Sequence, residues 1–187
     1  MKKYYKGEFA YYEWKKKRIT IQTILLFALS LGLYLVGFVT SGSNKNLLTI
    51  VAVLGLLPAS NSLVSAVMYY RYHGCSKDDH DAMEGVFADF VSGYGFVFTT
   101  YKKNYEVSGL IVKNGYVYGL LKNHPEETGD IEEHINSIAK QNGHNVVCGM
   151  FTDRDGFLKR LKELSEKETE DSKKDEAVFR LMTEISL

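Results

Sequence analysis

Charged side chains are absent from two long stretches of this chain, although the whole sequence carries 23 Lys and Arg against 23 Asp and Glu. Residues 19–40 and 47–70 contain no Asp, Glu, Lys, Arg or His. A bilayer core of about 30 Å needs roughly 20 helical residues to cross it, and both stretches reach that length. The sequence therefore predicts an integral membrane α-helical hairpin, in which a short polar loop at residues 41–46 joins two transmembrane helices.

Cysteine is also scarce, since the chain has only Cys75 and Cys148. Both follow the second apolar stretch, in the region that we expect to lie in the cytoplasm, where thiols stay reduced. We expect no disulfide. A secretory signal peptide is the alternative interpretation of the first stretch, but its apolar region would be about 7 to 15 residues long and would not be followed at once by a second span.

Basic residues are concentrated before the first apolar stretch. Residues 1–18 contain seven Lys and Arg, whereas the loop between the stretches contains one. The positive-inside rule then places both the N- and C-termini in the cytoplasm. Tyr and Trp residues precede the first stretch and Tyr residues close the second, as expected at a membrane interface.

The net charge of zero hides a division along the chain. Residues 1–18 have seven basic and two acidic side chains, a net charge of +5, while residues 71–187 have fifteen basic and twenty-one acidic side chains, a net charge of −6. A basic arm suits the anionic lipids of the inner leaflet, which we expect as one partner. An acidic soluble region does not suit nucleic acid, so we expect none to bind.

The distribution of charged and apolar residues divides the chain into four regions. These are a basic and aromatic juxtamembrane arm (1–18), the transmembrane hairpin (19–70), a cytoplasmic α/β domain (71–164), and a charged linker with a C-terminal amphipathic helix (165–187). Apolar spacing predicts an α-β-β-β-α-β-α order in the third region. A helix from Ser76 through Val91 comes first, and strands at 94–100, 105–112, 116–121 and 146–151 follow. Asn114-Gly115 predicts a type I′ turn between the second and third strands.

This order of elements resembles the core of restriction-endonuclease-type folds, and the segment 105–122 resembles the strand-turn-strand of the bacterial nuclease-related domain. That resemblance implies an Asp on the first strand and a Glu-x-Lys on the second, which would hold Mg²⁺ and position water. Here Glu106 to Gly109 and Tyr118 to Lys122 occupy those strands, and Leu120 stands where the Glu of Glu-x-Lys is required. We therefore expect a core without its active site and assign no catalytic residue. We also expect the membrane to be the cytoplasmic membrane of a bacterium.

The sequence gives little support for other candidate sites. His73, Cys75 and His80, with Asp78 and Asp79, are suitable metal ligands, but their spacing matches no zinc pattern and spans a helix start. We expect a polar connector there, with no metal and no cofactor. Asp153 or Asp155 is expected to cap a helix.

Small and polar residues within the apolar stretches predict how the spans pack. Asn61 is the most polar side chain at its depth and needs a partner. Pairs of small residues four apart permit close helix approach. The residues predicted to mediate helix packing, between the two spans or with spans of another chain, are Ala28, Gly32, Gly55, Ala59, Asn61, Ser62 and Ala66.

The C-terminal helix presents one apolar face, which either packs on its own domain or binds a partner. The residues of this face are Val178, Leu181, Met182 and Ile185. We expect a non-enzymatic, membrane-tethered domain that acts as scaffold, adaptor or sensor through a protein partner. One alternative is a self-associating hairpin that forms a pore or remodels membrane, with the chain as a homo-oligomer. A second alternative is a divergent nuclease or phosphodiesterase.

Overall fold

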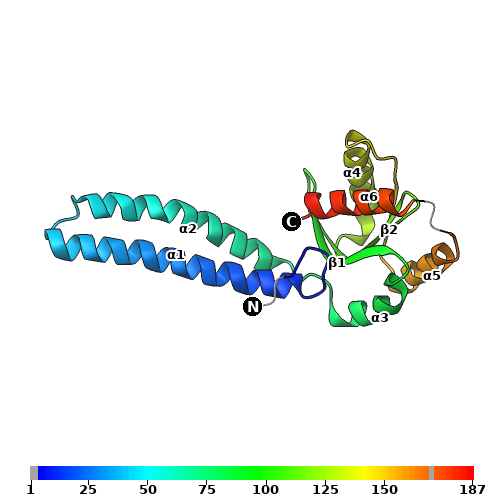
Figure 1. Cartoon of the computed structure of the whole chain (residues 1–187), viewed down its shortest axis with the longest axis horizontal. Helices are drawn as coiled ribbons and strands as arrows, with labels where there is room; N and C mark the ends of the chain where they lie inside the picture. Colours follow the sequence, from blue (N-terminus) through cyan, green and yellow to red (C-terminus); the bar gives the residue numbers. More distant parts are fainter. Residues whose placement is uncertain (1–3, 169–170) are drawn as a thin grey trace. The chain divides into compact units, whose positions relative to one another are not determined.

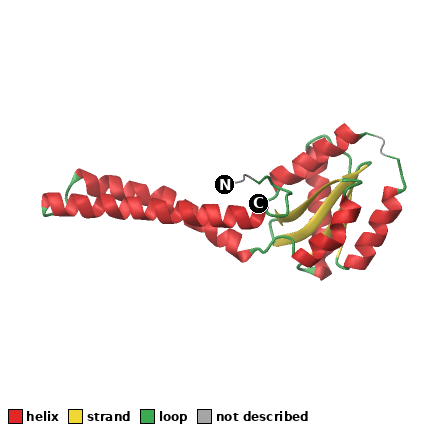
Figure 2. Ribbon diagram, turned by 60° about the horizontal axis from the view of Figure 1, so that its bottom comes forward, coloured by secondary structure: helices red, strands yellow, loops and turns green. Residues whose placement is uncertain are grey.

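The computed structural model describes residues 4–168 and 171–187. The chain forms two compact units (Figures 1 and 2): residues 12–72 make a helical hairpin, and the described residues up to Tyr11 join those from His73 onward in an α/β unit. The helices and strands, in chain order, are α1 (Tyr11–Ser41), α2 (Leu47–Arg71), α3 (Lys77–Phe87), β1 (Val91–Thr99), β2 (Asn104–Lys113), β3 (Tyr116–Leu121), the 3₁₀ turn η1 (Pro125–Glu127), α4 (Thr128–Gln141), β4 (Val147–Phe151), α5 (Arg154–Ser165) and α6 (Ser172–Ile185).

The hairpin consists of two long apolar helices joined by a capped loop. Asn46 ends the loop, and its side-chain oxygen accepts a hydrogen bond from the backbone N–H of Thr49 at 2.8 Å. The amide group of the same side chain donates to the carbonyl of Gly37 at 2.9 Å, which ties the start of α2 to the end of α1. The first helix begins at Tyr11, before the apolar stretch, because the intervening Lys and Arg residues are good helix formers.

The α/β unit is built on a four-stranded mixed sheet in the order β1-β2-β3-β4. The first three strands form an antiparallel meander, and β4 pairs with β3 in parallel after the crossover through α4. The predicted type I′ turn connects β2 to β3, since Asn114 and Gly115 both have positive φ, at 51° and 76°. The predicted α-β-β-β-α-β-α order is confirmed.

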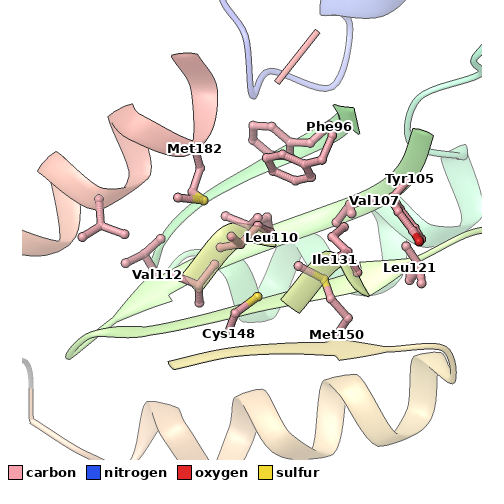
Figure 3. Close-up of a cluster of buried hydrophobic side chains, with 14 residues drawn as sticks. Phe96, Tyr105, Val107, Leu110, Val112, Leu121, Ile131, Cys148, Met150 and Met182 are labelled. Atoms are coloured by element: carbon pink, nitrogen blue, oxygen red, sulfur yellow. The ribbon is translucent and has the colours of Figure 1, made fainter. Parts of the chain in front are cut away.

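Helices cover both faces of the sheet (Figure 2). One face packs against α4 and α6, where Ile131 and Met182 are fully buried among strand residues (Figure 3). Ile135 and Val178 belong to the same buried cluster. The other face packs against α3 and α5 through Met83, Phe87, Phe157 and Leu161. The apolar face of α6 is thus covered by the sheet of its own unit, with Leu181 and Ile185 partly buried at the margin.

One helix boundary in this unit differs from the sequence prediction. We expected the helix that starts after Ser76 to include Phe90 and Val91, but α3 ends at Phe87 and Val91 opens β1. Val91 pairs with Val112 across the sheet, where a β-branched side chain packs well. Long-range strand pairing thus outweighs the helical spacing of the last two apolar residues.

Both edges of the sheet are occupied. On β1, the backbone N–H of Tyr94 donates to the carbonyl of Gly7 at 2.8 Å, and the N–H of Leu187 donates to the carbonyl of Val97 at 2.9 Å. On β4, the N–H groups of Cys148 and Met150 donate to side chains of α4, namely Asn136 at 3.0 Å and Glu132 at 2.7 Å. These contacts fill the positions where another strand would pair.

Candidate functional site

The two helices of the hairpin expose large apolar side chains. Val39 is 79% exposed and Leu57 is 69% exposed, and similar residues line most of both helices. Soluble monomers rarely expose apolar surface of this extent, because water penalises it. Each helix is long and apolar enough to span a membrane.

Small and hydroxyl-bearing side chains form the contact between α1 and α2. The hydroxyl of Thr23 donates to the carbonyl of Ile19 and lies 2.8 Å from the hydroxyl of Ser62, in a buried position. A Cβ atom at Gly55 would come within 2.7 Å of the Ser30 hydroxyl, so a larger residue there would force the Ser30 side chain to move. The buried hydroxyl groups of Thr23 and Ser62 therefore find hydrogen-bond partners within the hairpin.

The structure separates the seven predicted packing residues into two groups. Gly55, Ala59, Ser62 and Ala66 lie against α1, where Ala59 is completely buried. The other three are Ala28, Gly32 and Asn61: Ala28 and Asn61 are exposed, and a Cβ atom at Gly32 would meet no heavy atom within 4 Å. Spacing alone could not separate the groups, because it does not fix which way each helix faces.

A polar cluster lies where α3 meets the ends of β2 and β3. Asp79 on α3 accepts a hydrogen bond from the Ser108 hydroxyl at 3.2 Å, and its carboxylate lies 3.8 Å from the guanidinium of Arg154. The Lys122 ammonium donates to the carbonyl of Gly74 at 3.4 Å, and the Glu106 carboxylate accepts the backbone N–H of His73 at 3.3 Å. These bonds fasten the segment before α3 to the sheet.

This cluster comes from the elements that would carry the nuclease site. Lys122 directly follows the last residue of β3, whereas Leu120 is only 5% exposed and packs in the apolar core between the sheet and helices α3 and α5. Asp79 is engaged by Ser108 and Arg154, the arrangement of a hydrogen-bonded ion pair. We derive no hydrolytic step from these side chains.

Within the described part of the chain, one group of three metal-ligand side chains has its ligand atoms within 4.8 Å of one another, namely His80, Asp81 and Glu84. His80 belongs to the juxtamembrane set that the sequence singled out, whereas Asp81 and Glu84 do not. His80 and Glu84 are four residues apart, so the His-x-x-x-Glu spacing in the sequence could have indicated that these two side chains lie on one face of the helix. The ring of His80 lies 4.1 Å from that of Phe9 and 4.6 Å from that of Tyr94, which explains its position by packing.

Neither cysteine has the character of a nucleophile. Burial, with a smaller contribution from the Asp79 carboxylate, raises the pKa of the Cys75 thiol to about 12. Burial likewise raises the pKa of Cys148. A catalytic cysteine requires the opposite shift.

We expect Cys75 of the folded chain to react with iodoacetamide at pH 8 on the order of a thousandfold more slowly than an ordinary thiol, because so little thiolate is present. Mass spectrometry of peptides after timed alkylation measures the rate, and the chain unfolded in urea is the control. Alkylation at equal rates in both states would contradict the partly buried position of this thiol.

A groove of about 290 Å³ opens between the β1–β2 turn and α4. Tyr101 at the tip of the turn is fully exposed, and Lys102 beside it forms an ion pair with Asp130 at 3.1 Å. Neighbouring Lys103 hydrogen-bonds Glu127 at 2.6 Å, which lowers the pKa of that carboxyl. Sequence reasoning missed this surface, although a tyrosine in a basic turn was the available signal. The lining residues are Thr100, Tyr101, Lys102, Asp130, Glu133, His134 and Ser137.

Comparison with known proteins gives no relative: no protein-family model, no curated protein and no solved structure matches this chain.

Proposed function

We propose that this chain is a two-pass membrane protein whose hairpin holds a non-enzymatic α/β unit at the cytoplasmic face, where the unit binds a protein partner. The observation that carries the proposal is the division of the chain. Residues on both sides of the hairpin, up to Tyr11 and from His73 onward, belong to one compact unit. Both ends of a membrane-spanning hairpin must then lie on the same side of the bilayer.

The N-terminal arm supports this arrangement. The Lys6 ammonium donates to the carbonyls of Thr183 at 3.2 Å and Ser186 at 2.7 Å, and Gly7 bridges to Tyr94 of β1. The arm is thus held in the α/β unit through long-range contacts. The basic run at residues 15–18, just before the apolar part of α1, supports a cytoplasmic location for that side, next to anionic lipid.

The absence of enzymatic activity is part of the proposal. We propose that the α/β unit is a restriction-endonuclease-like core that lacks its active site, on the support of its element order and of Lys122 directly after β3. Leu120 in place of a carboxylate supports the loss of chemistry. Nicking of plasmid DNA by the purified chain with Mg²⁺ or Mn²⁺, abolished by Lys122→Ala, would contradict this assignment.

The groove beside Tyr101 is the surface that we assign to the partner. Strand addition is disfavoured because both sheet edges are occupied, and the apolar face of α6 is covered. A fully exposed tyrosine at the lip of a groove is typical of an interaction anchor, since its ring gives large contact area and its hydroxyl a hydrogen bond.

Crosslinking and affinity capture of the full-length chain from its native membrane test the partner assignment. We expect one protein to be captured with the wild-type chain and lost with Tyr101→Ala, because the anchor of the groove is removed. Val147→Ser is the matched control, since Val147 is also exposed, at 59%, but lies on β4 outside the groove. Equal capture by a chain that ends at residue 75 would overturn the assignment.

A further inference from the structure

A polar groove runs along one flank of the hairpin, where the apolar surface is interrupted. It has a volume of about 290 Å³ and lies between α1 and α2. We call it the amide groove, after the side chains of Gln22 and Asn61. Pro58 and Ser65 lie on the same face of α2 as Asn61, three residues before it and four after it.

The two amides of this groove point away from the hairpin contact. Gln22 and Asn61 are both exposed, and among the described residues neither side-chain amide makes a hydrogen bond. The contact of Ser65 in the groove is with the backbone carbonyl of Asn61, at 3.1 Å, and leaves the Asn61 amide available. By contrast, the side-chain hydroxyl groups of Thr23 and Ser62 form a hydrogen bond with each other inside the hairpin.

Depth makes the exposure of Asn61 significant. Asn61 lies nine residues before Tyr70, which is about 14 Å along the helix at 1.5 Å per residue. Tyr70 belongs to the interfacial end, where the Lys16 ammonium lies 5.2 Å from its ring centroid. The hydrocarbon half-thickness is about 15 Å, so Asn61 lies inside the apolar layer. A side-chain amide there is costly unless it finds a donor and an acceptor.

A second copy of the chain supplies that partner at the correct depth. Two copies inserted in the same orientation are related by a two-fold axis along the membrane normal, so each brings Asn61 to the same level. A carboxamide has both donors and acceptors and is therefore complementary to itself. Ser65, one turn from Asn61, is small enough to allow close helix approach. Lys15, at the mouth of the groove, is four residues before the apolar stretch, at the level of anionic headgroups.

We propose that the chain forms a two-fold homodimer in the membrane through the amide groove, in which the Asn61 amides of the two copies bond to each other. The proposal rests on the membrane insertion proposed above. Another surface of the hairpin contains the small pair Ala28 and Gly32, and Gly32 has open space beyond its Cα atom. That surface carries no amide and supplies the matched control.

Energy transfer between fluorophores fused to the N-terminus of the full-length chain tests the dimer in phosphatidylcholine–phosphatidylglycerol liposomes over a range of protein-to-lipid ratios. We expect Asn61→Leu to weaken association about three- to thirtyfold, the range measured for interhelical polar contacts. Asn61→Gln keeps an amide and should retain association, and Gly32→Leu should leave it unchanged. Wild-type association in Asn61→Leu, or its loss in Gly32→Leu alone, would overturn the proposal.

Alkaline carbonate extraction of the same liposomes separates the two proposals. Protein released by carbonate would contradict membrane insertion. Protein that stays in the bilayer but shows no concentration-dependent energy transfer would contradict the dimer alone. Among the described residues the exposed Asn61 side chain makes no hydrogen bond, and a Cβ atom at Gly32 would meet no heavy atom within 4 Å. Unchanged helical circular dichroism is therefore expected for all three variants and checks that each is folded.

Discussion

Replacing Met182 by Ala is expected to lower the free energy of unfolding of the α/β unit by about 2–5 kcal/mol. The Met182 side chain is completely buried between α6 and the sheet, among strand residues of the core (Figure 3), in the cluster that also contains Val178. Removing its side chain loses apolar burial and leaves a cavity that close packing cannot fill. Urea titration of the full chain in mild detergent, with hydrogen exchange of the β2 amides as the readout, measures the change in the free energy of unfolding.

Arg180→Ala is the matched control on the same helix. The Arg180 side chain is 79% exposed and pairs with Glu184 on the surface, so its removal should change stability by no more than about 0.5 kcal/mol. Equal stability of Met182→Ala and the wild type would mean that α6 is not part of the core. The apolar face of α6 would then be free to bind a partner, as the sequence alone allowed.

Gly115→Val is expected to destabilise the same unit by about 1–3 kcal/mol, because a β-branched side chain is strained at the φ of +76° that the type I′ turn requires. The turn is also a point of long-range attachment. The Asp175 carboxylate on α6 accepts the backbone N–H groups of Asn114 at 3.0 Å and Gly115 at 3.4 Å. Strain at the turn should therefore weaken the contact with α6, and the urea midpoint measures the total.

Gly129→Ala provides the control for loss of a glycine. Gly129 lies in the first turn of α4, and a Cβ atom there would meet no heavy atom within 4 Å. Alanine should leave stability unchanged or raise it by up to about 1 kcal/mol, since it restricts the unfolded chain and favours helix. An unchanged midpoint in Gly115→Val would contradict the assigned turn conformation.

The sequence predicted the helices and strands well, because helix caps and tight turns depend on residues that are close together in the chain. Ser76 and Asp153 cap α3 and α5 through bonds to backbone N–H groups three residues later, at 3.1 Å and 2.8 Å. The Asn114-Gly115 turn follows from the backbone freedom of two residues. The lack of charged residues over two long stretches identified both apolar helices, and short apolar runs identified the four strands.

Contacts between residues far apart in the chain could be identified only from the structure. No local pattern indicates that Asp175 reaches the turn sixty residues earlier, or that Gly7 closes the edge of β1. The rotation of α2, which buries Ser62 and exposes Asn61, depends on the Thr23 contact and on the close approach at Gly55. The amide groove and the groove beside Tyr101 follow from these arrangements, so spacing in the sequence could supply only their individual residues.

Protease protection of the full-length chain in membrane vesicles tests the central claim most directly. In inside-out vesicles we expect protease to remove the α/β unit and the N-terminal arm and to leave one protected fragment that contains both apolar helices, about residues 12–72. In right-side-out vesicles the whole chain should resist digestion. Digestion of the α/β unit from the outside, or cleavage between the two helices from the cytoplasmic side, would contradict a two-pass anchor with both ends in the cytoplasm.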